Sequence, residues 1–525
     1  MDFSNIAALT IVSKNYVSLA RALCDSFLNE HPGATFFVVL VDDLEDEFEP
    51  DNEKFTLLNI DSIGLPSPDV FRYQYNVLEL NTAVKPFALK HILSSFDFIE
   101  KVAYIDPDIY IYRSLNKVWE SLDHYSVVLT PHMREPFYDD QSPTETNILQ
   151  SGTYNLGFIA LCKGETTNKL LMWWMQKLYL NCIIDIPNGL FVDQKWIDLV
   201  PAYFEDVYIL HDPSFNVAYW NLHERELTRQ DKTYYVDEIP LSFFHFSGYC
   251  PLEPNKMSKH QTRHELDDNQ LWQDVFDNYG DKLIKAEYEK TKKYHYAYSK
   301  LPNGIELNGA IYIIIRHCLA NNILFPSPQF EADLFCDFLL TPNVMLYGYE
   351  VAPLLHGILL LRPDVKAAYP EAWYGDVNGL ISWCENSGID ELDLSCLIEN
   401  HWHNLKSRNS VLLISDIYFR RSDINQAFPN LQPQSESLDG FLKWLEQYGK
   451  IEEQVTGKDI KEFKDALLGF YKCLILYLIR PDINLKFTDL AANPSLYYAW
   501  LKENLRIIPN LNQSEIEVFL LFSKE

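Results

Sequence analysis

Two aspartates, Asp106 and Asp108, stand two residues apart directly after the apolar run 102–105. Carboxylate oxygens suit Mg²⁺ or Mn²⁺, which proteins hold through one or two carboxylates together with the phosphates of a substrate. A simple turn is the alternative explanation, because Asp and Pro both favour turns and Pro107 separates the two aspartates. If the run before them is a strand of a parallel sheet, the pair lies at the edge where such sheets bind ligands. That position favours a metal and phosphate site.

His245 and Asp193 are further candidates for chemistry, and each has a structural alternative. His245 stands between Phe244 and Phe246, so it is either an imidazole buried among aromatic rings or a third metal ligand. Asp193 precedes an apolar-periodic helix and fits the N-cap position as well as a catalytic one. The residues by themselves leave both alternatives open.

The elements that must position these residues alternate over the first 260 residues. Short β-rich runs are predicted at 6–12, 36–41, 102–105, 126–130 and 156–161, and a helix at about 16–29. Strands separated by helices of about 10–15 residues indicate βαβ units and a mainly parallel sheet. We therefore expect an α/β, Rossmann-like domain whose polar strand ends meet at one edge.

The charge of the chain excludes several classes of function. It has 525 residues, with 44 Lys and Arg against 74 Asp and Glu, and a formal net charge of -30. Binding to nucleic acid or to an anionic membrane needs clustered basic residues, so both roles are disfavoured. The nine cysteines include no Cys-x-x-Cys pair, and neither a signal peptide nor an apolar run of about 18 residues is found. We expect a cytoplasmic protein without a transmembrane segment.

Six segments of the chain, in this order, resemble those of GT-A-fold glycosyltransferases of the family 8-like type. They are Thr10-Ile11-Val12-Ser13 with Tyr16, Lys85 after Asn81-Thr82-Ala83-Val84, Asp106-Pro107-Asp108, Tyr154-Asn155-Leu156-Gly157-Phe158, Phe191-Val192-Asp193-Gln194 and His245-Phe246-Ser247-Gly248. Each segment alone is unspecific, but the ordered set is specific and covers about half of the chain. The family often continues its last segment into Lys-Pro-Trp, whereas this chain continues with Tyr249-Cys250-Pro251 and has Lys256 further on.

The resemblance implies a nucleotide-sugar donor, a UDP-sugar, and a Mn²⁺ or Mg²⁺ cofactor. It implies donor contacts from Thr10, Val12, Tyr16, Lys85, Asp106, Gly248 and Lys256, and metal ligands in Asp106, Asp108 and His245. It places Asp193 or Gln194 at the donor sugar and Asn155 at the acceptor or the sugar hydroxyls, which makes these three the predicted catalytic residues. Family 8-like enzymes retain the anomeric configuration. In an inverting enzyme, Asp193 would be the base on the acceptor hydroxyl.

The remainder of the chain has a different character. Residues 261–300 are polar and are predicted to form a helical connector, and residues 301–525 a mainly α-helical domain. Within it a pattern of Arg, Asp and Trp recurs, with its aspartates 59 residues apart at positions 364, 423 and 482. We interpret it as three copies of one helical unit, each capped by its Asp and anchored by an aromatic residue. The repeats are either architectural or a surface for an acceptor, a protein partner or a second copy of the chain.

The sequence thus predicts a metal-dependent glycosyltransferase of the hexosyltransferase type, acting on a glycan, a glycolipid or a protein-linked acceptor, as in polysaccharide or glycoprotein biosynthesis. A nucleotidyltransferase of similar fold is one alternative. Such an enzyme normally has a Gly-rich, basic loop after its first strand, and here that loop is Ser13-Lys14-Asn15-Tyr16. A non-catalytic scaffold that uses the helical repeats is the other alternative, and the complete set of Asp106, Asp108 and His245 argues against it.

Overall fold

The structure, a computed structural model, describes most of the chain in two compact units, Met1–Phe335 and Cys336–Glu525. The described residues are 2–342 except 46, then 344–402 except 347, 348, 371 and 373–376, and then 414–479 except 415, 416, 419, 430, 432–434, 454 and 456. Beyond these, residues 483, 497, 498, 500, 501, 515, 516 and 519 are described. Among the described helices, none combines the length and the apolar character needed to cross a bilayer.

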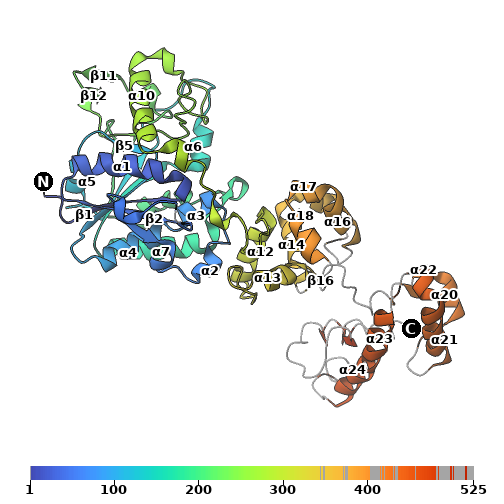
Figure 1. Cartoon of the computed structure of the whole chain (residues 1–525). Coiled ribbons are helices and arrows are strands. Elements are labelled where there is room, and N and C mark those ends of the chain that lie inside the picture. The colour runs from blue at the N-terminus through green and yellow to red at the C-terminus, as the bar shows by residue number, and fades with distance from the viewer. Residues whose placement is uncertain are drawn as a thin grey trace. The chain divides into compact units, whose positions relative to one another are not determined.

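A seven-stranded sheet forms the centre of the first unit (Figure 1). Its strands lie in the order β10-β6-β7-β4-β1-β2-β3. Their bounds are β1 (Ile6–Val12), β2 (Thr35–Leu40), β3 (Thr56–Asn59), β4 (Lys101–Ile105), β6 (Val127–Pro131), β7 (Tyr154–Cys162) and β10 (Val207–Ile209). β7 runs antiparallel to β4 and β6, and the other neighbours are parallel. The predicted mostly parallel α/β sheet is confirmed.

Helices cover both faces of this sheet. Alternate residues of each strand point to opposite faces, so each strand contributes apolar side chains to the packing on both sides. Along β1, Ala7, Leu9 and Ile11 join one apolar cluster, while Ile6, Ala8 and Val12 join the other. The first cluster includes residues of α3 (Val77–Ala83), α4 (Lys85–Ser95) and α7 (Glu165–Asn181). The second includes residues of α1 (Val17–Glu30) and α5 (Asn116–Ser121). Figure 1 shows α1 and the pair α4 and α7 on opposite sides of the strands.

A two-stranded sheet beside the main one brings distant parts of the chain together. β5 (Ile109–Ile111) follows the Asp-Pro-Asp turn and pairs antiparallel with β14 (Phe243–His245), with Ile109 opposite His245. Phe244 of β14 and Phe246 just after it then pack against Phe276 of α10 (Gln270–Lys285). This helix, together with α11 (Tyr288–Thr291) and α12 (Gly309–Ala320), belongs to the first unit, so the segment predicted as a connector lies within that unit.

Smaller elements complete the first unit. They are β8 (Ile184–Asp185), β9 (Leu190–Phe191), β11 (Leu227–Gln230), β12 (Thr233–Val236), β13 (Ile239–Pro240), α2 (Pro68–Phe71), α6 (Glu145–Ser151), α8 (Gln194–Ile197) and α9 (Val200–Tyr203).

The second unit is mainly helical where it is described, as predicted. Its helices include α14 (Pro353–Leu361), α15 (Pro363–Ala368), α16 (Asn378–Trp383), α17 (Ile389–Glu391), α18 (Ser395–His401), α20 (Ser422–Ala427), α21 (Glu436–Trp444), α22 (Lys450–Glu452), α23 (Gly457–Ala466) and α24 (Leu468–Ile479). α13 (Ala332–Leu340) spans the boundary between the units, and β15 (Val344–Leu346) and β16 (Tyr349–Val351) form a hairpin.

Two of the predicted repeats have the same local structure. Arg362 forms a paired contact with Asp364 (2.8 and 2.6 Å) and lies over the ring of Trp383 at 5.6 Å. In the next copy Arg421 pairs with Asp423 and lies 5.7 Å from the ring of Trp444. After each tryptophan the helix widens into one π-helical turn, Cys384–Gly388 and Leu445–Gly449.

The expectation that the repeated aspartates cap their helices is wrong. Arg362 and Arg421 occupy the N-cap positions, and Asp364 and Asp423 lie in the first turn. Each of these carboxylates pairs with the guanidinium of the arginine two residues earlier. In the third copy, residues 480–482 and 487 lie outside the described residues.

Candidate active site

Asp106, Asp108 and His245 converge, although about 140 residues separate the turn from the histidine. The aspartates occupy the turn between β4 and β5, and the pairing of β5 with β14 places His245 next to them. His245 Nε2 lies 3.0 Å from Asp108 Oδ1 and 3.8 Å from Asp106 Oδ2. One ligand atom from each residue fits within 4.8 Å of the others. The histidine is buried, while about a quarter of each aspartate is exposed, so the group is open on its acidic side.

The imidazole of His245 is oriented from behind by Asn155. Its Nδ1 donates to Asn155 Oδ1 at 3.1 Å, which turns Nε2 toward the carboxylates. Asn155 Nδ2 in turn donates to His132 Nε2 at 3.3 Å. Burial lowers the pKa of His132 to about 4, so that ring is a neutral acceptor. Trp220 packs edge-on against His245 at 5.1 Å and closes the remaining side.

Gly157 on β7 allows this close assembly. A Cβ atom at this position would lie 2.5 Å from His245 Cε1, 2.8 Å from Asn155 Oδ1 and 2.9 Å from Asp106 Oδ2. The Gly157 carbonyl also accepts from the amide of Asp106 at 2.8 Å. Any residue with a Cβ atom would clash with these three side chains, so the position requires glycine.

Lys85 is the cation of the site. Its ammonium lies 2.9 Å from Asp193 Oδ2 and 3.9 Å from Asp106 Oδ1, and it donates to the Leu156 carbonyl at 3.0 Å. Burial by itself lowers the pKa of Lys85, but the charges of Asp193 and Asp106 outweigh it and the net pKa is raised. Burial raises the pKa of Asp193 despite the ion pair with Lys85. Lys85 is thus a buried positive charge between two carboxylates.

Around His245, neighbouring negative charges oppose the effect of burial on the pKa of the imidazole. Burial lowers the pKa of His245, but the charge of Asp108, its hydrogen bond and the charge of Asp106 raise it further, so the net pKa lies above the ordinary value. The same contact acts on Asp108, whose net pKa is lowered although burial raises it. The protein therefore concentrates negative charge at a place where a cation would be stabilised.

The predicted catalytic residues lie next to this group. Asp193 occupies the N-cap position of α8 without a capping hydrogen bond and pairs with Lys85 instead. Both polar atoms of the Gln194 amide are engaged with backbone, since Oε1 accepts from Leu156 N at 2.9 Å and Nε2 donates to Ser151 O at 3.0 Å. Asn155 is likewise engaged, as described above. Their catalytic roles stay predictions.

The predicted donor residues are spread more widely. Thr10 and Val12 are buried within β1. Tyr16 is about half exposed, and burial together with the charge of Asp108 raises its pKa. Gly248 has a positive φ of 76°. Lys256 is exposed and forms no ion pair or hydrogen bond of its side chain with the described residues of the site.

Two residues near the site were not predicted. Tyr104 donates its hydroxyl to Asp106 Oδ1 at 2.5 Å, and its ring lies 4.2 Å from the Lys85 ammonium. Its position two residues before Asp106, on the same side of the strand, could have indicated it. His260 lies beside Gly248, where a Cβ would approach its Cδ2 to 2.6 Å, and its charge acts on Asp108. Nothing in the sequence around His260 indicates this, because the contact depends on the fold of residues 249–260.

No family model matches the chain. The uncharacterized proteins YfnD and YfnF of Bacillus subtilis (strain 168) are 26% and 29% identical over 172 and 184 residues, which are 32% and 34% of this chain. These stretches are 52% and 60% of the relatives' own length, so the chain spans little more than half of the curated relatives it matches.

Solved glycosyltransferases are also similar to the chain. The galactosyltransferase LgtC, in complex with donor and acceptor sugar analogues, is 15% identical with a TM-score of 0.32. The match covers 52% of this chain and 95% of the LgtC chain. The glycosyltransferase GlyE of Streptococcus pneumoniae TIGR4 is 13% identical with a TM-score of 0.31. The match covers 61% of this chain and 64% of the GlyE chain. The predicted resemblance to glycosyltransferases is thus found among solved structures. Because these TM-scores are below 0.5, this structural similarity carries no argument about activity.

Proposed function

We propose that the protein transfers a sugar from a nucleotide-sugar donor to an acceptor hydroxyl, with a divalent cation bound by Asp106, Asp108 and His245. The observation that supports it is the convergence of these three residues with the buried ammonium of Lys85 at the carboxyl edge of the sheet. In a chain of net charge -30, a diphosphate can be held only where local cations oppose the overall field. The site offers such a place.

The residues fit a metal ion well. Two carboxylates and one imidazole whose Nε2 faces them are ligands that Mn²⁺ accepts readily, whereas Mg²⁺ prefers oxygen alone. Asn155 sets the imidazole orientation, as second-shell partners of metal ligands generally do. When bound, the cation would supply Lewis-acid stabilisation of the diphosphate leaving group. We therefore propose Mn²⁺ in preference to Mg²⁺.

The chain's own groups would do the remaining work. The Lys85 ammonium adds positive charge beside Asp106, where the leaving diphosphate develops negative charge. Asp193, buried and paired with Lys85, would face the donor sugar. In a retaining reaction it would stabilise positive charge at the anomeric carbon. In an inverting one it would accept the proton of the acceptor hydroxyl, and its raised pKa suits a base.

The donor and acceptor complete the proposal. A UDP-sugar is the donor that the resemblance implies, with Tyr16 and Gly248 as its further contacts. A retaining outcome follows from the same resemblance. The acceptor is a glycan, a glycolipid or a protein-linked sugar, and the helical repeats of the second unit would provide a surface for it or for a protein partner.

A screen of UDP-, GDP- and dTDP-sugars for metal-dependent hydrolysis and thermal stabilisation tests the proposal. At least one donor should be hydrolysed with Mn²⁺ and not with EDTA. Asp106→Asn and Asp108→Asn should abolish hydrolysis with the fold intact, while Asp97→Asn, a change at an exposed aspartate elsewhere, should not. Release of pyrophosphate from a nucleoside triphosphate instead would indicate a nucleotidyltransferase. No response to any nucleotide sugar would refute the transferase.

A further inference from the structure

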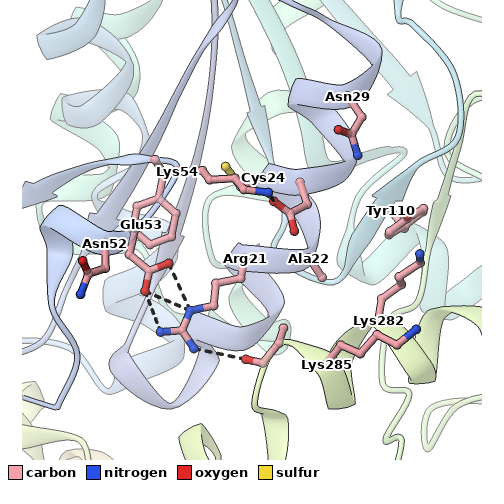
Figure 2. Close-up of a pocket in the computed structure, with 13 residues that line it drawn as sticks. Arg21, Ala22, Cys24, Asn29, Asn52, Glu53, Lys54, Tyr110, Lys282 and Lys285 are labelled. Atoms are coloured by element: carbon pink, nitrogen blue, oxygen red, sulfur yellow. Dashed lines mark hydrogen bonds and ion pairs between the residues drawn. The ribbon is translucent and has the colours of Figure 1, made fainter.

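A groove lies between α1 and α10, and none of the residues that line it belongs to the metal group. Its larger part has a volume of about 390 Å³ and its smaller part about 210 Å³. Both parts are lined by Asn29, Tyr110 and Lys282, so they adjoin and form one continuous groove. Figure 2 shows the larger part, with Arg21 of α1 and Lys282 and Lys285 of α10 on its walls. Two adjoining parts can hold successive units of a chain-like ligand.

The groove is basic although the protein is strongly acidic. Five basic side chains line its two parts, against three acidic ones. Arg21 is held by Glu53 at 2.6 Å, and Lys54 by Asp25 at 2.7 Å. Lys282 and Lys285, one helical turn apart, form no ion pair with any residue that the structure describes. These two ammonium groups are therefore available to an anionic ligand.

Lys232 extends this basic character into the smaller part of the groove. It is exposed and, within the described part of the chain, has no acidic partner. The positive charge is thus sparse but present in both parts of the groove, since Lys285 lines the larger part, Lys232 the smaller part and Lys282 both. A ligand with occasional negative charges matches this spacing.

Aromatic and amide side chains line the spaces between the lysines. Tyr110, Tyr112 and Tyr234 follow one another edge to face, at ring distances of 5.0 and 5.8 Å. The hydroxyl oxygen of Tyr112 is buried and has no hydrogen-bond partner among the described residues. Asn29 and Asn278 add amide groups. Ring faces with hydroxyl and amide groups between them fit sugar rings, which have apolar faces and hydroxyl edges.

We propose that this groove binds an acidic oligosaccharide, with its carboxylates or phosphates on Lys282, Lys285 and Lys232 and its neutral sugar rings against the tyrosines. The saccharide nature of the ligand rests in part on the proposed function, since a transferase needs to hold its acceptor or product chain. Tyr110 directly follows Asp108-Ile109 along the chain, so β5 connects this groove with the metal group. The groove is a binding site, and no catalytic role is assigned to it.

Single-stranded nucleic acid also combines stacking bases with negative charge, but it fits the groove less well. It has one phosphate on every nucleotide, and its binding releases counterions only where many cations meet the backbone. Three lysines without acidic partners, in a chain of net charge -30, cannot match that density. A polysaccharide with a charge on every second or third sugar can be matched.

Binding to four fluorescently labelled probes tests the proposal, in EDTA and without any nucleotide sugar. The probes are an oligosaccharide of alternating uronic acid and N-acetylhexosamine, a phosphomannan oligosaccharide, neutral dextran and oligo(dT). Because no metal or donor is present, the result is independent of whether the transferase is correct. Lys282→Glu with Lys285→Glu should weaken binding of an acidic saccharide at least about tenfold. Lys163→Glu with Lys169→Glu, the same charge change at exposed positions elsewhere, should leave it unchanged.

Each result has one meaning. Preference for the uronic acid probe identifies a carboxylate ligand, and preference for phosphomannan a phosphate ligand; either supports the proposal. Tyr234→Ala should weaken the same probe, because it removes one ring face without a change of charge. Equal binding of dextran, tighter binding of oligo(dT), no binding of either acidic probe, or unchanged affinity in the Lys282 and Lys285 variant would overturn it.

Discussion

Replacement of Gly157 by alanine tests whether close packing assembles the metal group. The added methyl would lie 2.5 Å from His245 Cε1, whereas carbon atoms in contact are about 3.5–4.0 Å apart. The imidazole must therefore retreat by about 1 Å. A displacement of about 1 Å near the reacting groups costs about 100-fold in rate, and a disturbed ligand orientation costs about 10- to 100-fold in metal affinity. We expect losses of that size in both.

Two measurements and a control make this prediction specific. Mn²⁺ affinity would be measured by calorimetry or electron paramagnetic resonance, and donor hydrolysis under saturating Mn²⁺. Gly164→Ala, just beyond the other end of β7, is the matched control, because its methyl would meet no atom within 4 Å. Circular dichroism would establish that both variants are folded. If folded Gly157→Ala binds Mn²⁺ as tightly as the wild type and hydrolyses the donor equally fast, the steric argument is refuted.

Three further predictions concern other parts of the first unit. Asn155→Ala, which removes the partner of His245 Nδ1, should lower Mn²⁺ affinity by about 10- to 100-fold in a titration, and an unchanged affinity would mean that the amide does not orient the ring. Lys85→Met leaves Asp193 buried without its partner and should cost about 3–5 kcal/mol in urea unfolding; adding Asp193→Asn should restore stability but not donor hydrolysis, and recovery of hydrolysis would contradict the role of the ammonium. Burial lowers the pKa of His31 from 6.5 to about 4, so the unfolded chain binds a proton below pH 6.5 that the folded protein refuses, and the penalty grows to about 3 kcal/mol by pH 4. His31→Gln should therefore lose less unfolding free energy between pH 6.5 and 4 than the wild type does, and parallel losses would contradict this.

The strands of the main sheet could be predicted because they are local and strongly apolar. The run 6–12 is β1 residue for residue, the run 36–41 is shifted by one residue at each end relative to β2, and the run 102–105 lacks only the first residue of β4. Both faces of this sheet are covered by helices, so apolar side chains occur at consecutive positions and mark the strands clearly. The helical character of the second unit was also predictable, because helical periodicity is a local feature of the sequence.

The repeats show how far a spacing can be interpreted. The recurrence of Arg, Asp and Trp coincides with the same Arg–Trp arrangement at two of the three positions. It did not indicate what the residues do, since the aspartate pairs with the arginine and not with the backbone. Sequence spacing determines which residues are neighbours along a helix. The choice between two polar partners at similar distance depends on side-chain geometry.

By itself, then, the sequence determined the strands and helices, the acidic turn at a strand end and the set of candidate residues. Only the tertiary structure decided which of them meet. His245 reaches Asp108 because β14 pairs with β5 in one register, and Lys282 reaches the groove of Tyr110 because α10 packs beside α1. Such contacts join residues more than 100 positions apart. Local propensity has no information about them, because their free energy comes from long-range packing and strand pairing.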